Sequence, residues 1–427
     1  MNKTRYAQVG TGSRARFFYE AVASDFQETS ELVGFCDISQ TRMDYANTLL
    51  SQHGHQEVPT YFYTEFEKML EETKPDIVIV TTVDRSHDHY IIKAMEMGCD
   101  VLTEKPLTTD EKKAQAILDC QKRTGRKIRV SFNYRYAPHN TKIRELIADG
   151  TIGQVTSVHF EWLLNTQHGA DYFRRWHRNK INSGGLLVHK STHHFDLVNF
   201  WLGTEPESVF AYGDLKFYGR HNAEDRGEAH FYHRSHGSQW AKDDPFSIDI
   251  EGNETMKALY LNAEEDSGYV RDRSVFADDI SIEDTMGVLV KYHNGAIMTY
   301  SLNAYMPWEG FNVNINGTKG RIELHVVERP YVSAGGDKAD EGALKEKTLM
   351  VHPMFAAPYE VAIEEKEGGH GGGDPILLKD LFGESEEDPY NRAAGLEDGI
   401  KSILTGIAAN QSIASNREVK IKDLITL

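Results

Sequence analysis

The residues that first indicate chemistry form a glycine-rich turn near the N-terminus, at positions 10–15 (GTGSRA). The turn follows a predicted strand and precedes a predicted helix. In the order G-x-G-x-x-A, Gly10 allows the tight turn, Gly12 lets the backbone approach a pyrophosphate, and Ala15 lets the helix pack closely on the strand. The N–H groups at the start of the helix favour phosphate. The turn therefore predicts a nicotinamide or flavin dinucleotide site.

A carboxylate ends the second predicted strand. Asp37 follows Ala15 at the distance at which such folds place the acid that accepts the ribose hydroxyls of adenosine. The same charge repels a 2′-phosphate, so the sequence favours NAD over NADP. Ser39 and Arg42 lie close enough to weaken that preference, and NADP stays an alternative.

Lys105 follows another predicted strand of the same region, at the carboxyl end where such sheets bind ligands. An ammonium group there can donate to a reacting hydroxyl and stabilise the alkoxide character that develops as hydride leaves. The alternative is a solvated surface lysine, which is the common case.

His189 and His193 lie in a stretch, residues 184–201, that reads as one helix, where a spacing of four puts both on one face. An imidazole has a pKa suited to exchange a proton with a substrate hydroxyl. His189 either binds or orients a hydroxyl, shares proton transfer with His193, or forms a metal pair with it. No third ligand is identified, so no metal is predicted; a structural histidine is the remaining alternative.

The elements that must position these groups alternate between strand and helix through the first third of the chain. This order predicts a doubly wound parallel sheet with helices on both faces. After about residue 137, runs such as 286–292, 296–302 and 311–316 alternate like strands with one solvated face. Residues 293–295 and 317–320 read as hairpin turns.

Composition excludes some partners. The 427 residues carry 47 Lys+Arg against 65 Asp+Glu, a formal charge of −18, which disfavours nucleic acid and anionic membranes as partners. No run approaches the ~20 apolar residues of a membrane span, and the N-terminus lacks the apolar core of a secretion signal. Three cysteines favour a reducing compartment. We expect a cytoplasmic protein.

Further runs carry a family resemblance. They are TTVDRSH at 81–87, TEKPL at 103–107, FNYRYAP at 132–138, GTIGQV at 150–155, GGLLVHKSTHHFD at 184–196 and NGTKG at 316–320. With the glycine turn, their order and spacing resemble the glucose–fructose oxidoreductase / inositol dehydrogenase / rhizopine-catabolism (Gfo/Idh/MocA) family of sugar dehydrogenases.

The resemblance implies an α/β fold in two domains: an N-terminal Rossmann domain at residues 1–136 and, at 137–427, a substrate-binding α/β domain with an open, mostly antiparallel sheet. Residues 216–279 are predicted to be an insertion and 395–410 a C-terminal helix. The resemblance further implies hydride transfer between a nicotinamide and a secondary carbinol of a sugar, glycoside or cyclitol, in a site between the domains. We expect a homo-oligomer, a dimer or tetramer, formed through the second sheet.

The family pattern G-G-x-x-x-D-x-x-x-H, counted from Gly184, places its histidine at His193 and has His189 where an aspartate is usual. Lys105 and His193 are thus the predicted catalytic pair, with His189 assisting. Asn133 and Arg135 follow a Rossmann strand, His370 lies in a glycine-rich loop, and Tyr172 and Trp176 offer aromatic faces to a sugar. The predicted cofactor-binding residues are Gly10, Gly12, Ser13, Arg14, Asp37, Thr82, His87, Glu104, Lys105 and Asn133, and the predicted substrate-binding residues are Arg135, Tyr172, Trp176, His194 and His370.

Two other functions fit the same residues. In one, bound NAD is recycled while a glycoside is cleaved or a sugar epimerised, with no net redox change. In the other, the protein is a non-catalytic nucleotide- and sugar-binding regulator, against which the presence of both Lys105 and His193 counts.

Overall fold

The first sheet of the computed structural model is parallel throughout, as the sequence predicts; the structure describes residues 3–329, 346–364, 366, 369–384 and 387–426. Its order is β3-β2-β1-β4-β5-β6. Alternate side chains of its strands enter different cores: Val78 and Val80 pack with α3, α4 and α5, whereas Ile79 packs with α1. Helices therefore cover both faces. The elements are β1 (Thr4–Val9), α1 (Arg16–Ala23), β2 (Ser30–Asp37), α2 (Gln40–Gln52), β3 (Thr60–Phe62), α3 (Phe66–Thr73), β4 (Ile77–Val80), α4 (His87–Glu96), β5 (Asp100–Thr103), α5 (Glu111–Thr124) and β6 (Ile128–Val130).

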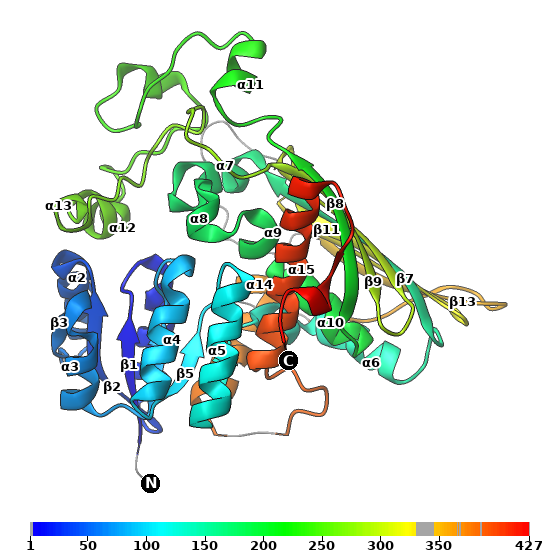
Figure 1. Cartoon of the computed structure of the whole chain (residues 1–427), viewed down its shortest axis with the longest axis horizontal. Helices are drawn as coiled ribbons and strands as arrows, with labels where there is room; N and C mark the ends of the chain where they lie inside the picture. The colour runs from blue at the N-terminus through cyan, green and yellow to red at the C-terminus, as the bar shows by residue number, and fades with distance from the viewer. Residues whose placement is uncertain (1–2, 330–345, 365, 367–368, 385–386, 427) are drawn as a thin grey trace.

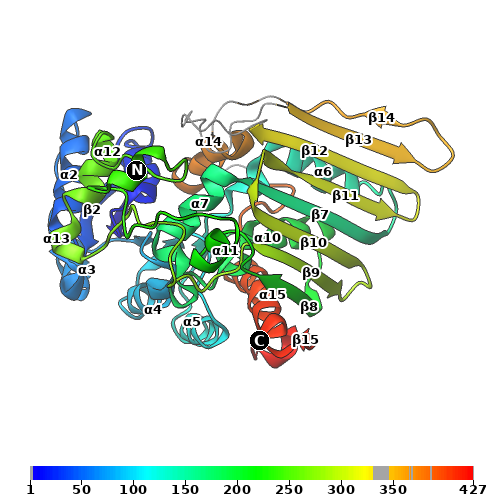
Figure 2. The same cartoon turned by 90° about the horizontal axis from the view of Figure 1, so that it is seen from above.

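The second sheet is mixed and mostly antiparallel, in the order β14-β13-β12-β11-β7-β10-β9-β8-β15, with β7 and β10 parallel (Figure 2). Strand β9 shows the predicted alternation: Met286 and Val288 are buried, while Gly287 and Leu289 are exposed. Both predicted hairpin turns are confirmed, between β9 and β10 and between β11 and β12. The strands are β7 (Val155–Asn165), β8 (Pro206–Asp214), β9 (Thr285–Tyr292), β10 (Ile297–Met306), β11 (Glu309–Gly317), β12 (Gly320–Arg329), β13 (Glu346–Pro353), β14 (Tyr359–Glu360) and β15 (Val419–Lys420).

Helices α6 (Pro138–Ala148), α10 (Thr192–Leu202) and α15 (Leu396–Ser415) lie on one face of this sheet (Figure 2). Helix α15 extends to Ser415 rather than ending at residue 410, and it contacts both cores. Ile400 and Ile403 pack with the parallel sheet's core, while Ala408 packs with the other. Helix α14 (Gly369–Phe382) also returns to the first sheet, where the ring of Phe382 lies 5.1 Å from that of Tyr6. The end of the chain thus ties the two sheets together.

The connection between β8 and β9 is a long excursion, although antiparallel neighbours such as these can be joined by a short hairpin. It contains α11 (Arg220–Asp225), α12 (Glu254–Met256), a π-helical turn at Lys257–Leu261 and α13 (Glu264–Ser267). Figure 1 shows it leaving the second sheet and crossing to α2. This segment brings residues far along the chain to the edge of the parallel sheet, where its ligand site is expected.

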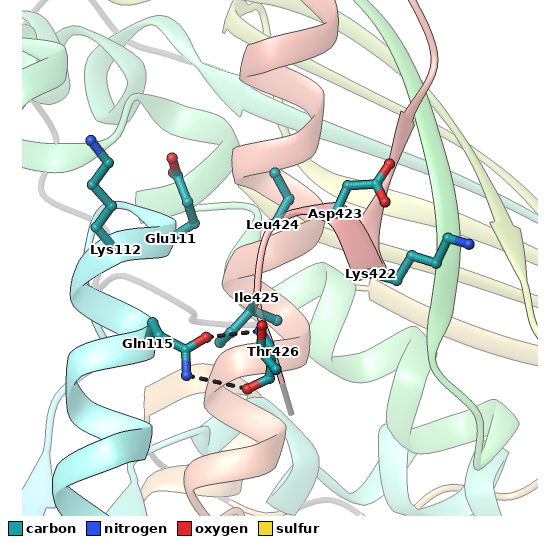
Figure 3. Close-up of a pocket in the computed structure, with 8 residues that line it drawn as sticks. All are labelled: Glu111, Lys112, Gln115, Lys422, Asp423, Leu424, Ile425 and Thr426. Carbon is teal, nitrogen blue, oxygen red and sulfur yellow. Dashed lines mark hydrogen bonds between the residues drawn. The ribbon is translucent and has the colours of Figure 1, made fainter.

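A cavity of about 340 Å³ lies elsewhere, between α5 and the C-terminal segment (Figure 3). There Gln115 Oε1 accepts from the N–H of Thr426 at 2.8 Å, and no predicted site residue lines the cavity. Among the helices of the described residues, none has the length and apolar character needed to cross a bilayer.

Candidate active site

The glycine turn lies at the point where the strand order reverses, between β2 and β4 on either side of β1. Gly10 has a φ of +88°, and a Cβ there would lie 2.6 Å from the carbonyl oxygen of Thr81, so the turn requires glycine. A Cβ at Gly12 would meet no atom, and the Gly12 N–H has no hydrogen-bond partner in the described part of the chain. Protein packing therefore does not explain Gly12, whereas a phosphate approaching its backbone would.

Asp37 ends β2 beside this turn, as predicted, and is buried. Its Oδ2 accepts from the N–H of Thr11 at 2.6 Å and from its hydroxyl at 3.0 Å, and Oδ1 accepts from the N–H of Ser39 at 2.8 Å. A carboxylate has about four acceptor positions, so one remains for a ribose hydroxyl. Asp37 thus fits an adenosine ribose and also fixes the turn.

The 216–279 region closes over the same edge. The Tyr260 hydroxyl donates to Ser13 Oγ at 2.9 Å, and Ser39 Oγ donates to Asp266 Oδ2 at 2.6 Å. Arg42 Nε donates to the carbonyl of Leu259 at 2.9 Å. These contacts place Tyr260 and Asp266, which the sequence did not single out, at the predicted dinucleotide site.

Lys105 lies just beyond β5 at the same edge, and its Nζ donates to the carbonyl oxygen of His189 at 3.3 Å. Its neighbour Glu104 accepts from Arg14 Nε at 2.6 Å. Burial raises the pKa of Glu104, but the charges of Arg14 and Lys105 outweigh this effect and hold it below its usual value. Arg14 and Glu104, predicted as cofactor contacts, therefore form an ion pair between the glycine turn and the Lys105 turn.

The other predicted cofactor residues of this edge support the same turn. His87 is buried, with Nδ1 2.9 Å from the carbonyl of Pro106 and Nε2 3.1 Å from that of Thr82. Both ring nitrogens thus face backbone oxygens, which favours a positioning role for His87. The hydroxyl of Thr82 accepts from Ser86 Oγ at 2.9 Å and is partly exposed at the end of β4.

His189, which lies on the side of the second sheet, makes a close polar contact with a residue of the first. Its Nδ1 lies 2.5 Å from Oδ2 of the buried Asp84, which follows β4. Burial, together with Lys105, lowers the pKa of His189 well below its usual value, and burial raises the pKa of Asp84. Both shifts disfavour a pair of separate charges, so the contact is a hydrogen bond that fixes the orientation of the His189 ring through Nδ1.

The sequence expectation of one helix over residues 184–201 is wrong. The chain forms α9 (Leu186–His189) and α10, with Lys190 and Ser191 between them. His189 and His193 therefore do not share the face of a continuous helix. His189 meets Asp84, whereas the His193 ring lies 4.9 Å from that of Tyr134 and 6.2 Å from that of His370.

His193 is buried, and its Nδ1 has no hydrogen-bond partner among the residues that the structure describes. Burial, followed by the charge of Lys105, lowers the pKa of His193 well below its usual value. A neutral imidazole keeps one nitrogen lone pair, so His193 is in the form that accepts a proton. Within the described residues, no group of three or more His, Cys, Asp or Glu side chains is placed to hold a metal.

His370 reaches this cluster from α14, with a left-handed φ of 51° at the kinked start of the helix. Its Nδ1 lies 3.0 Å from Oδ2 of Asp374, and Oδ1 of the same carboxylate accepts from Asn133 Nδ2 at 2.7 Å. Asn133 and His370, predicted separately for cofactor and substrate, are thus joined through Asp374 beside His193.

Two of the predicted substrate residues lie inside the fold. Arg135 pairs in a bidentate manner with buried Asp196, at 2.7 and 2.6 Å, and also donates to Asp398 at 2.9 Å. Burial raises the pKa of Asp196 to about 6, which leaves it ionised at neutral pH. The His194 ring stacks on Trp162 at 4.2 Å, and Nδ1 lies 2.7 Å from the Tyr300 hydroxyl. These contacts favour structural roles for Arg135 and His194.

Tyr172 and Trp176 surround His189, with ring centroids 5.6 and 5.9 Å from its ring. His177 lies closer still, at 4.2 Å, and stacks on Trp176 at 3.6 Å. The sequence did not select Asp84, although it follows a switch-point strand inside the run TTVDRSH. That position was the available signal; no local pattern marks Tyr260, Asp266 or Asp374.

Comparisons with known proteins agree with this architecture. The description "Oxidoreductase family, NAD-binding Rossmann fold" matches residues 4–132, and "Oxidoreductase family, C-terminal alpha/beta domain" matches residues 144–421. YteT of Bacillus subtilis (strain 168), which bears the name of an oxidoreductase, is 38% identical over 98% of both chains. The myo-inositol 2-dehydrogenase of Thermotoga maritima is 24% identical over 91% of both chains.

Among solved structures, the WlbA dehydrogenase from Bordetella pertussis in complex with NADH and UDP-GlcNAcA has a TM-score of 0.64 at 16% identity, covering 98% of this chain and 99% of that one. At this identity the similarity shows the fold. The two family matches and the full-length relative show more: this chain is an oxidoreductase with an NAD-binding Rossmann domain, and it belongs to the Gfo/Idh/MocA family.

Proposed function

We propose that the protein transfers hydride between NAD and a secondary carbinol of a sugar, glycoside or cyclitol. The observation that carries the proposal is the convergence of Lys105, the Asp84–His189 pair and His193 at the carboxyl edge of the parallel sheet, beside the glycine turn. Relatives that bear the names of inositol and glucoside dehydrogenases support this class of substrate.

In this proposal the Lys105 ammonium donates to the reacting oxygen and stabilises its negative charge as the C–H bond breaks. The nicotinamide, when bound, would accept the hydride during oxidation of the carbinol and donate it during the reverse reduction. His193 is neutral, so it accepts the hydroxyl proton during oxidation and returns it during reduction. His189 binds a neighbouring hydroxyl through Nε2 and is held in that orientation by Asp84.

The aromatic side chains of Tyr172 and Trp176 would border the sugar, and His370 would approach it from the side of His193. Gly10, Gly12, Ser13 and Asp37 would hold the dinucleotide, with NAD favoured because both Asp37 and Asp266 oppose a 2′-phosphate.

A homo-oligomer formed through the open face of the second sheet is also proposed, since Leu289 and Ile297 are large apolar residues exposed there. We keep the cytoplasm as the proposed location; Cys36, Cys99 and Cys120 are buried free thiols.

The excursion over the dinucleotide edge favours a second candidate, in which NAD stays bound and is recycled while a glycoside is cleaved or a sugar epimerised. Tyr260 and Asp266 form hydrogen bonds with Ser13 and Ser39 at that edge, and contacts of this kind would slow exchange of a dinucleotide bound beneath them. A redox-neutral enzyme needs no exchange of cofactor between turnovers.

One experiment tests both candidates. The purified protein is incubated with sugars, sugar acids, cyclitols and glycosides, with and without added NAD⁺, and both reduced nicotinamide and carbohydrate products are measured. Stoichiometric NADH formation supports the dehydrogenase. Product formation at full rate without added NAD⁺ and without NADH supports recycling, and bound NAD with no change in any carbohydrate would refute both.

A further inference from the structure

A cluster of arginines surrounds a single carboxylate next to the proposed substrate site. Asp171 and Arg174 lie on α7 (Thr166–Arg174), Arg175 follows it, and Arg271 comes from the excursion between β8 and β9. Asp171 Oδ1 accepts from Arg271 Nη2 at 2.7 Å and from Arg174 Nη1 at 3.3 Å, and Oδ2 accepts from Arg175 Nη1 at 3.3 Å. Three guanidinium groups thus share one carboxylate.

The charges of this cluster do not balance. The side chains of Arg174 and Arg271 are 3% and 5% exposed. Arg271 Nε and Nη1 and Arg175 Nε are buried with no hydrogen-bond partner in the described residues. Burying unpaired charge is costly unless another group compensates it. The surplus of positive charge therefore indicates an anion that binds here.

Neighbouring groups respond to the same surplus. Burial raises the pKa of Asp171, but the arginines outweigh it and hold the pKa well below its usual value. Burial likewise raises the pKa of the Tyr260 phenol, and Arg175 and Arg271 reverse the shift and lower it. Both groups are neutral when protonated, and the arginines push both toward their anionic forms, so the field at this point attracts negative charge.

The cluster is partly open to solvent and lies next to residues of the proposed substrate site. The side chains of Arg175 and Asp171 are 25% and 26% exposed. Arg175 directly precedes Trp176 and His177, whose rings lie beside His189. Its charge also contributes to the lowered pKa values of His177 and His189. A ligand whose hydroxyl meets Lys105 and His189 can therefore place a substituent at Arg175.

We propose that Arg175, backed by Arg271, binds an anionic group of the substrate, so that the enzyme acts on acidic sugars. This rests on the hydride-transfer function proposed above. A guanidinium fork matches the paired oxygens of a carboxylate or a phosphate. The two sources are a sugar acid and a sugar phosphate, and the test separates them.

The test uses the NAD-loaded full chain and matched substrates: a neutral sugar, the corresponding uronate and the corresponding sugar phosphate. One acidic member should have a kcat/KM about ten- to hundredfold above the neutral member, as expected for a charge-assisted contact. Arg175→Gln should remove most of that advantage by raising KM, and Arg175→Lys should restore part of it. Arg220→Gln is the matched control, because Arg220 is an exposed arginine of the same excursion paired with Glu224.

Equal kcat/KM for neutral and acidic members would overturn the proposal, and so would an equal loss for all members in Arg175→Gln. If Arg175→Gln raises the dissociation constant for NAD and leaves the substrate preference unchanged, the arginines bind the dinucleotide pyrophosphate and the proposal is wrong. Calorimetric titration of the NAD-loaded protein tests anion binding separately from hydride transfer. Binding of the uronate or phosphate that Arg175→Gln weakens, without turnover, would support the anion site while refuting hydride transfer.

Discussion

The contact between Asp266 and the start of α2 predicts which dinucleotide the protein selects. Asp266 Oδ2 accepts from Ser39 Oγ at 2.6 Å and from the N–H of Thr41 at 3.0 Å. These donors lie just after Asp37, where a 2′-phosphate of NADP would have to bind. Asp266→Asn keeps an oxygen for both donors and removes the charge. It should therefore strengthen NADPH binding and leave NADH binding nearly unchanged.

The size of the effect follows from Coulomb's law. Asp266 is exposed, so the dielectric constant of water applies. A phosphate that takes the same donors would lie about 5 Å from the carboxylate, where each pair of unit charges repels by about 0.8 kcal/mol. A phosphate of charge about −1.5 to −2 is then repelled by about 1.5 kcal/mol, or roughly tenfold in affinity. Asp37 keeps its charge, so NADH should remain the tighter ligand.

The assay is fluorescence titration with NADH and NADPH, which needs no substrate. Glu265→Gln is the control, because it removes an equal charge from the neighbouring exposed residue, for which no contact with α2 is described. Unchanged NADPH affinity in Asp266→Asn would refute the reasoning, as would an equal gain in Glu265→Gln. Tighter binding of NADPH than NADH by the unaltered protein would refute the assignment of Asp37 and Asp266 together.

Three further predictions concern the site, and a fourth concerns stability. Lys105→Met should lower kcat by about 10²–10³-fold while the NADH dissociation constant measured by titration changes little, and near-normal turnover would exclude Lys105 from catalysis. Asp84→Asn should lower kcat/KM by about ten- to hundredfold through the loss of its bond to His189; a His189→Asn variant that is far more active than Asp84→Asn would contradict the pair. Because the pKa of His193 lies well below its usual value, the acidic limb of kcat/KM should fall below pH 6.5, and a limb at or above pH 6.5 would exclude His193 as the base. Burial lowers the pKa of His139 to about 3, so between about pH 3 and 6.5 this ring binds a proton only in the unfolded protein. The free energy of unfolding measured with urea should therefore fall as the pH is lowered below 6.5, by up to about 1.4 kcal/mol per pH unit from this residue, and His139→Gln should reduce that slope.

The fold was predictable where local patterns carry it. Alternation of strand and helix, the positive-φ glycine at Gly10 and the acid that ends β2 are all short-range features, and the parallel sheet follows from them. The sequence predicts helix α15 but ends it at residue 410 rather than Ser415, because the residues after 410 include polar side chains on the exposed side. The break between His189 and Thr192 was missed, since no glycine or proline marks it.

The sequence predicts which residue types lie at the candidate site, but it does not predict which side chains contact each other there. Local sequence predicts the glycine turn, Asp37 and Lys105, because strand ends and turns are set by neighbours in the chain, whereas His193 is predicted from the family pattern. The long-range contacts are visible in the tertiary structure alone: Asp84 meets His189 across 105 residues, Asp266 reaches Ser39 across 227, and Tyr260 reaches Ser13 across 247. Such contacts depend on how the excursion and the second sheet pack against the first, and no local periodicity encodes the packing of separate units.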